Sequence, residues 1–268
     1  MVSASAITGI VFTLIITLIV PVVIWIVFAK KVKGISKAII AGALGFIIPQ
    51  LFIRIPVLQL LSTNPSVTQF SKDNKYFFLL ILAFSAGLFE TTGRLIVLKV
   101  LSKNELSYYS SLGAGYGHGA AEAVGLIGLT YINNIIFAIM INTGSLPLGE
   151  QYESIKDTFL TTSSSLFYAA GIERILTVIF HIGLTVFLAY MMTKKRTFAG
   201  FVLCIVLHTL LDFTVVSVSM LTQNTWISLA VLLVFTVISA IYIIKFKNKF
   251  KIKEMPMDPA AKALEEGY

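Results

Sequence analysis

Long runs of apolar residues alternate with short polar segments along the whole chain. The runs lie at residues 5–29, 36–61, 76–101, 107–131, 163–192, 198–220 and 226–246. Each is long enough to cross a bilayer as an α-helix, which needs about 20 predominantly apolar residues. None shows the period-two alternation of barrel strands. The pattern therefore predicts an all-α protein, a polytopic bundle of seven transmembrane helices.

The polar segments divide this predicted bundle into parts. The parts are two N-terminal spans with an outer loop (1–75), a catalytic-like four-helix core of spans three to six (76–220), a seventh span (221–247) and a cytoplasmic tail (248–268). The first run is too long for a signal-peptide core, and Lys30 and Lys31 follow it, which favours an uncleaved helix. The acidic segment 143–162 is expected to carry a surface helix.

Basic residues indicate how the bundle is oriented. With the N-terminus outside, the inner loops and tail hold fifteen of the 21 basic residues: Lys30, Lys31, Lys33, Lys37, Lys99, Lys103, Lys194, Lys195, Arg196, Lys245, Lys247, Lys249, Lys251, Lys253 and Lys262. The outer loops hold Lys72, Lys75 and Lys156. Cytoplasmic loops of membrane proteins carry such an excess, so an N-out, C-in orientation is expected.

Composition supports a membrane protein and excludes other classes. Hydrophobic residues make up 57% of the chain and charged residues 13%, against about 25% charged in soluble domains. A soluble globular enzyme and a disordered chain are thereby excluded. The net charge of +8 follows the predicted topology, so membrane lipid is the expected partner and nucleic acid is not. The single cysteine, Cys204, cannot form an internal disulfide.

Ionisable residues inside the predicted spans are the main functional signal. They are Arg54, Glu90, Arg94, Glu122, Glu173, Arg174, Asp212 and all three histidines, His118, His181 and His208. A charged group at the centre of a span costs about 2.5–3.5 kcal/mol on insertion scales, so these groups must pair or face a hydrated cavity. Arg54 is expected to reach outward or to pair with an acid. Glu173 and Arg174 fit a salt bridge near the outer boundary.

The remaining groups recur at a spacing of four residues. Residues four apart project from one face of a helix. Glu90 precedes Arg94 on span three, His118 precedes Glu122 on span four, and His208 precedes Asp212 on span six. Span five adds His181. Counted from the span ends, Glu90 and the three histidines fall near mid-membrane, and four helices are expected to turn them toward one buried layer.

Span four also carries a glycine pattern. Gly113 and Gly117, and separately Gly115 and Gly119, are four residues apart. Small residues at this spacing let membrane helices approach closely. Close packing of span four is the first explanation of these glycines, and room beside His118 for a substrate backbone or a water molecule is the alternative.

The buried layer suits two kinds of chemistry. In an intramembrane endopeptidase, a glutamate activates water, and histidines stabilise the oxyanion or hold a metal. Three imidazoles plus water suit tetrahedral zinc, although the spacing is not HExxH. In a proton- or cation-coupled transporter, the same groups relay protons or bind ions. The chain shows no inverted repeat, which disfavours the transporter.

The ordered motifs resemble the CPBP superfamily of intramembrane proteases, which includes the type II CAAX-prenyl endopeptidases. The matching residues are Glu90 and Arg94 (ExxxR), the glycine-flanked His118, and His208 with Asp212 (HxxxD). Within that superfamily, the GxGHGxxE stretch and the later ER-to-His stretch look most like the YhfC family of bacterial membrane proteins. Phe89 and Ala114 depart from the superfamily pattern, and Phe89 stands where the first glutamate of an EE pair is usual.

The resemblance implies a multi-pass intramembrane endopeptidase of the bacterial plasma membrane that cuts membrane-embedded peptide or protein substrates. Glu90 or Glu122 would activate water, and His118, His181 and His208 would bind zinc or stabilise the oxyanion. Arg94 and Asp212 would orient Glu90 and His208. A metal-free glutamic mechanism and a metalloprotease mechanism both remain open, and a non-catalytic immunity or scaffold protein is the third hypothesis.

Overall fold

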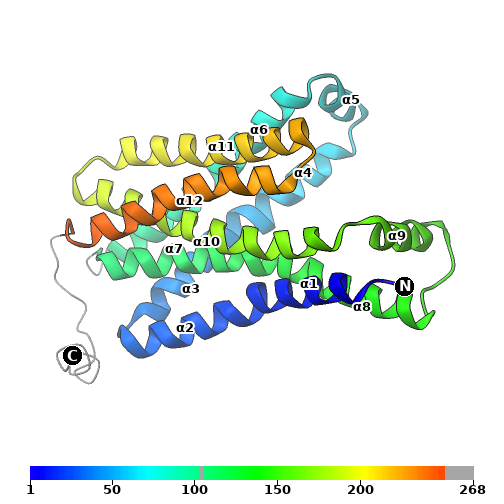
Figure 1. Ribbon diagram of the computed structural model, residues 1–268. Helices are drawn as coiled ribbons and strands as arrows, with labels where there is room; N and C mark the ends of the chain where they lie inside the picture. The colour runs from blue at the N-terminus through cyan, green and yellow to red at the C-terminus, as the bar shows by residue number, and fades with distance from the viewer. Residues whose placement is uncertain (103–105, 251–268) are drawn as a thin grey trace.

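The computed structural model describes residues 1–102 and 106–250, and it is a bundle of long helices (Figure 1). Seven helical spans in this part of the chain are long and apolar enough to cross a membrane: Ala4–Lys31, Ile35–Ser62, Lys75–Ser102, Tyr108–Thr143, Ser164–Thr193, Thr197–Thr222 and Thr225–Lys247. The described residues contain no strand. The predicted all-α, seven-span fold is confirmed. Lys103 and the predicted tail beyond residue 250 lie outside the described residues.

Three spans contain a π-helical segment, where the helix is locally wider. The first span comprises α1 (Ala4–Leu14), the π-helix Ile15–Ile19 and α2 (Val20–Lys31). The second span comprises α3 (Ile35–Phe46), the π-helix Ile47–Arg54 and α4 (Ile55–Ser62). The fourth span comprises α7 (Tyr108–Glu122), the π-helix Ala123–Gly128 and α8 (Leu129–Thr143). The remaining spans are α6 (Lys75–Ser102), α10 (Ser164–Thr193), α11 (Thr197–Thr222) and α12 (Thr225–Lys247).

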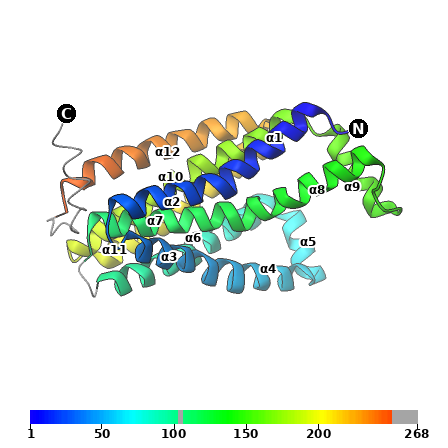
Figure 2. The ribbon, with the colours of Figure 1, turned by 90° about the horizontal axis from the view of Figure 1, so that it is seen from below.

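The fourth span is longer than the sequence predicted. Hydropathy placed its end at residue 131, just before Asn133 and Asn134, but α8 continues to Thr143. Gly144 ends it in the left-handed conformation, at φ 70°, which glycine adopts without steric cost. The expected surface helix is present as α9 (Glu150–Thr161), and a second short helix, α5 (Pro65–Asp73), lies at the same end of the bundle (Figures 1 and 2).

The two predicted glycine pairs of α7 face two different helices. A methyl group on Gly117 would lie 1.9 Å from the backbone oxygen of Ile39 on α3, so only glycine fits at that contact. Gly113 also faces α3, whereas Gly115 and Gly119 face the backbone of α10. The glycines therefore seat α7 closely between α3 and α10, which fixes the height of His118 relative to both neighbours.

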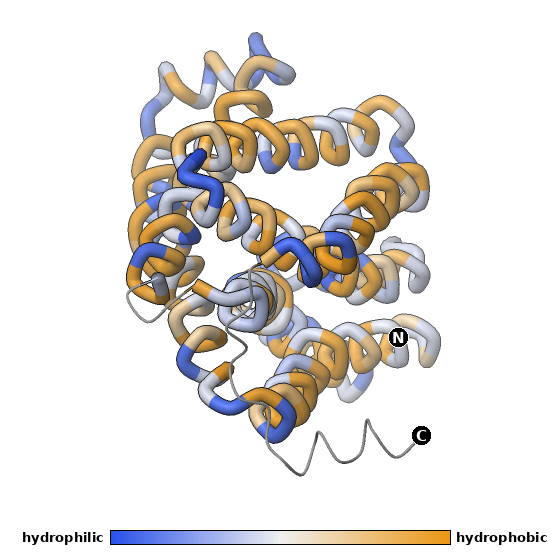
Figure 3. Tube along the Cα trace, turned by 90° about the vertical axis from the view of Figure 1, so that its left-hand side faces the viewer, coloured by the Kyte–Doolittle hydropathy of each residue, from blue (hydrophilic) through white to orange (hydrophobic). Residues whose placement is uncertain are grey.

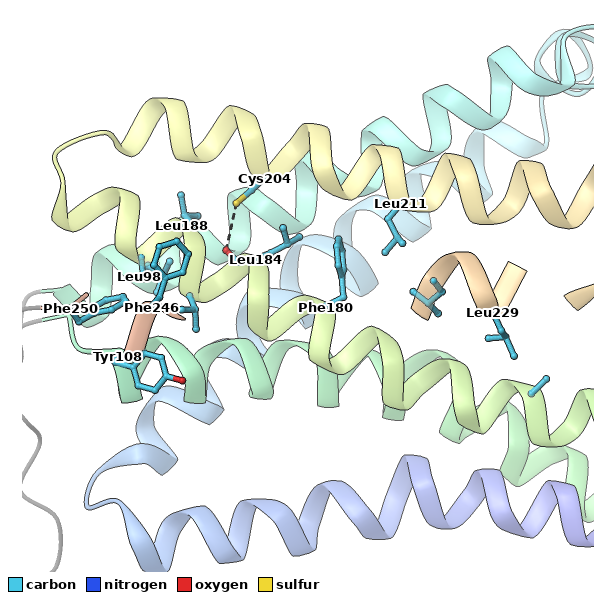
Figure 4. Packing of buried hydrophobic residues seen from close by; sticks show 14 residues of the cluster. Leu98, Tyr108, Phe180, Leu184, Leu188, Cys204, Leu211, Leu229, Phe246 and Phe250 are labelled. Atoms are coloured by element: carbon cyan, nitrogen blue, oxygen red, sulfur yellow. Dashed lines mark hydrogen bonds between the residues drawn. The ribbon is translucent and has the colours of Figure 1, made fainter. Parts of the chain in front are cut away.

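The most extensive apolar cluster joins α10, α11 and α12 (Figure 4). Cys204 of α11 is fully buried there, and its thiol donates to the carbonyl oxygen of Leu184 on α10 at 3.6 Å. Elsewhere large apolar side chains are exposed along most spans, and hydrophilic residues gather at the helix ends (Figure 3). Such an apolar perimeter fits a lipid-facing surface. Which end faces the cytoplasm stays a prediction from the basic residues.

Candidate active site

Four helices bring one glutamate and three histidines together in the interior. Glu90 lies on α6, His118 on α7, His181 on α10 and His208 on α11, and none is more than 3% exposed. The Oε2 atom of Glu90 is 3.1 Å from Nε2 of His118 and 3.0 Å from Nε2 of His208. An ionised carboxylate only accepts, so both imidazoles donate to Glu90 through Nε2. The expected buried layer exists in the structure.

Arg94 does not pair with Glu90, contrary to the sequence expectation. Its Nη2 donates to Nδ1 of His181 at 2.9 Å, and its Nε donates to the hydroxyl of Thr185 at 2.9 Å. Arg94 lies one helical turn beyond Glu90, at the level where α10 presents these two acceptors. The carboxylate of Glu90 is drawn instead to the imidazoles of α7 and α11. Arg94 therefore orients His181.

Glu122 lies on the other side of His181. Its Oε2 is 2.5 Å from Nε2 of His181, and its Oε1 accepts from Nη1 of Arg174 at 2.7 Å. The second amine of Arg174 pairs with Glu173, as the sequence suggested. Because Arg94 donates to Nδ1 of His181, the proton of the neutral ring belongs on Nε2, next to Glu122. His181 is thus clamped between Arg94 and Glu122.

Asp212 and Arg54 complete the predicted polar set. Oδ2 of Asp212 is 3.2 Å from Nδ1 of His208, close enough for an ion pair although not aligned as a hydrogen bond. The predicted Asp212–His208 pairing is therefore present. Arg54 neither reaches outward nor pairs with an acid: it donates to the Ser85 hydroxyl at 2.9 Å and the Leu82 carbonyl at 2.7 Å. Those α6 acceptors are nearer than any carboxylate.

The residues fit a divalent metal in three respects. Ligand atoms of Glu90, His181 and His208 all lie within 4.8 Å of one another and are buried. Each of the two histidines has a carboxylate on its other nitrogen, Glu122 or Asp212, which is the usual support of a metal-bound imidazole. The connected polar cluster contains four carboxylates, those of Glu90, Glu122, Glu173 and Asp212, but only two arginines, Arg94 and Arg174. A divalent cation or protonated histidines would balance the excess negative charge.

This metal-type group differs from the three histidines expected from sequence. Glu90 takes part in it, and His118 does not. Nδ1 of His118 is buried without a hydrogen-bond partner, so that ring keeps one free polar atom. Arg94 now donates to the Nδ1 lone pair of His181, and a cation held through that atom would replace this bond.

A cavity of about 430 Å³ adjoins the cluster. Its polar wall is formed by Glu90, Glu122, Glu173, Arg174, His181, His208 and Asp212. Sequence reasoning missed two further polar wall residues, Gln50 of the second span and Thr177 of α10, as well as Thr185, the hydroxyl partner of Arg94. Gln50 is uncharged and so does not belong to the set of ionisable residues, although a polar amide in the apolar run IIPQLF is also a signal of a buried polar site.

Fold and site together define a multi-pass membrane protein with a buried glutamate–histidine centre. Comparison with known families matches residues 16–241 to the family described as YhfC intramembrane metalloprotease. The chain belongs to this family. It is also 28% identical over 207 residues to a Bacillus subtilis (strain 168) protein named "Uncharacterized membrane protein YhfC", covering 73% of this chain and 79% of that protein. No solved structure matches the chain significantly.

Proposed function

We propose that this protein is an intramembrane endopeptidase that hydrolyses membrane-embedded peptide or protein segments. The observation that carries the proposal is the convergence of Glu90, His181 and His208 at the wall of a cavity among membrane-spanning helices, with His118 bonded to Glu90 from behind. Peptide hydrolysis in a bilayer needs a confined water, a group that takes its proton and donors for the oxyanion. The polar wall contains carboxylates that can take a proton and imidazoles that can donate to an oxyanion.

Glu90 is the group we assign to water activation. Both histidine contacts reach its Oε2, which leaves Oε1 as the oxygen able to accept a proton from water. The imidazoles of His118 and His208 donate to Oε2 of Glu90, so they are placed to stabilise negative charge that develops beside this carboxylate. Glu122 is held by Arg174 and acts through His181 as a positioning residue.

A metal, where bound, would be held by Glu90, His181 and His208, with Glu122 and Asp212 supporting the histidines. It would polarise the scissile carbonyl and lower the pKa of bound water. Protein residues would still orient the ligands and exclude bulk water. The family description favours the metal-dependent form, whereas the two hydrogen bonds to Glu90 also support a glutamic form.

The test compares membranes of cells that produce the wild-type protein with membranes of cells that produce Glu90→Gln. Mass spectrometry of newly formed peptide termini should find membrane-protein cleavages in the wild-type sample that are absent from the variant. Glu153→Gln, an exposed change on α9, is the matched control and should retain every cleavage. Identical termini in all three samples would reject the endopeptidase.

Proton- or cation-coupled transport is the second candidate. It is supported by the series of contacts from Glu122 through His181 to the neighbourhood of Glu90. Such series of ionisable groups serve as proton relays in membrane proteins. Glu90-dependent proton or cation flux in proteoliposomes, without any Glu90-dependent cleavage, would favour it.

A further inference from the structure

Gln50 is a buried amide that no established contact explains. It is 5% exposed, and its Oε1 atom has no hydrogen-bond partner. The side chain lines the same cavity as Glu90, His181 and His208. Leaving a buried polar atom unpaired is unfavourable, so such an atom at a cavity wall indicates a partner that binds there.

The local helix geometry turns Gln50 into the cavity. Pro49 has no N–H to donate along the helix, and the π-helical segment Ile47–Arg54 begins two residues earlier. The neighbouring side chains Ile48, Pro49 and Ile53 face a separate apolar groove that this segment forms with α6. The segment is therefore a wall between that groove and the polar cavity, with Gln50 on the cavity side. Such π-helical segments are frequent at functional sites.

The rest of the cavity indicates the class of ligand. From Glu90 it extends along α6 past Ala83 to Leu79, about 16 Å of helix, and α11 adds Leu211, Val215 and Val216. Beyond the polar end these walls are aliphatic. They complement an apolar peptide segment, whose backbone amide and carbonyl groups would still need hydrogen-bond partners between such walls.

We infer that Gln50 binds the substrate backbone, donating from its amide nitrogen to one carbonyl and accepting at Oε1 from one peptide N–H. A carboxamide offers one group of each kind, as a peptide unit does. Two such bonds fix the position of the apolar segment along the cavity and hold a neighbouring peptide bond beside Glu90. Gln50 is thus a substrate-binding residue of the proposed endopeptidase, and this inference rests on that proposed function.

The experiment uses Gln50→Leu in the full-length protein reconstituted in liposomes. Gln59→Leu is the matched control, because Gln59 is an exposed glutamine on α4 of the same span. The probe is a quenched fluorescent peptide that spans the most abundant Glu90-dependent cleavage site found in membranes. We expect Gln50→Leu to raise KM about tenfold, as the loss of backbone hydrogen bonds predicts, with kcat changed less than about twofold. Gln59→Leu should change neither.

Thermal unfolding separates binding from a structural role. Since Oε1 of Gln50 has no protein partner to lose, Gln50→Leu should keep the wild-type Tm. An unchanged KM would overturn the inference, and so would an activity loss that parallels a fall in Tm. Absence of any Glu90-dependent cleavage by the wild-type protein would instead reject the proposed function itself, and the role of Gln50 with it.

Discussion

Two buried glutamates lie on adjacent helices of this bundle, yet they have different partners. Glu90 is contacted by imidazoles, with His118 and His208 donating to one of its oxygens. Glu122 is contacted by Arg174, a permanent cation, and by His181. Hydropathy treats both residues as equal violations of an apolar span. Only the contacts that Glu90 and Glu122 make with neighbouring side chains distinguish the two residues.

The difference bears on what each carboxylate can do. A guanidinium cannot give up its proton at any ordinary pH, so Arg174 holds Glu122 as a fixed anion in a structural ion pair. Imidazoles can donate, accept and exchange protons, so the surroundings of Glu90 can change during a reaction. Pairs of carboxylates in contrasting environments are how enzymes divide roles. We propose that Glu90 performs the chemistry and that Glu122 positions His181.

The largest effect expected from this comparison is on stability. Arg174→Met leaves Glu122 buried without its cation, which costs about 3–5 kcal/mol when one partner of a buried pair is removed. Chemical unfolding in detergent measures the loss. Adding Glu122→Gln should recover much of it, and Arg196→Met, at an exposed site, should cost little. An Arg174→Met protein as stable as the wild type would contradict the fixed-anion role of Glu122.

The next effect distinguishes the two glutamates by activity. Glu90→Gln should lower kcat/KM about 10²-fold or more, because the amide cannot take a proton from water. Glu122→Gln should lower it about tenfold, since the amide keeps a polar oxygen beside Nε2 of His181 but loses the negative charge. Fluorogenic cleavage in liposomes gives both ratios. If Glu122→Gln proves the more damaging change, the two roles are reversed.

A third prediction concerns metal affinity. If Glu90, His181 and His208 hold a metal, Asp212→Asn and Glu122→Gln should each weaken its binding about 10–100-fold, because each removes the carboxylate behind a ligand histidine. Zinc competition with a chromophoric chelator, read as metal bound per chain, measures this without activity. Asp157→Asn, an exposed change on α9, is the control. Active wild-type protein that binds no metal would assign Glu90 to the glutamic mechanism.

The seven-helix bundle and much of the polar cluster around Glu90 could be predicted from the sequence, because both depend on patterns within single helices. Seven apolar runs predict seven spans, and an ionisable residue inside an apolar run must face inward wherever it lies. The i, i+4 spacing also predicted correctly that Asp212 lies beside His208.

Patterns within single helices do not predict which side chains of different helices contact one another. Glu90 and Arg94 share a face of α6 but bond to different neighbours, because helix heights and side-chain reach decide which acceptor is nearest. The assignment of Arg174 to Glu122 depends on the close seating of α7 against α10 through Gly115 and Gly119. The spacing of residues along the sequence does not specify how α7 and α10 are positioned relative to each other along their axes.

The smallest expected effect concerns Thr185, which holds Arg94 in place. The Thr185 hydroxyl accepts from Nε of Arg94 at 2.9 Å and donates to the carbonyl oxygen of His181 at 2.8 Å. Thr185→Val removes both bonds, and should lower kcat/KM about fivefold, equivalent to about 1 kcal/mol. Cleavage kinetics in liposomes measure the change.

Thr236→Val is the matched control for Thr185→Val. Thr236 is also buried, but its hydroxyl bonds only to the main-chain oxygens of Leu176 and Leu232, away from Arg94. Its replacement should lower stability slightly and leave kcat/KM unchanged. Equal kinetic losses in the two variants would mean that Thr185 contributes packing alone, and that His181 keeps its orientation through Glu122 without help from Arg94.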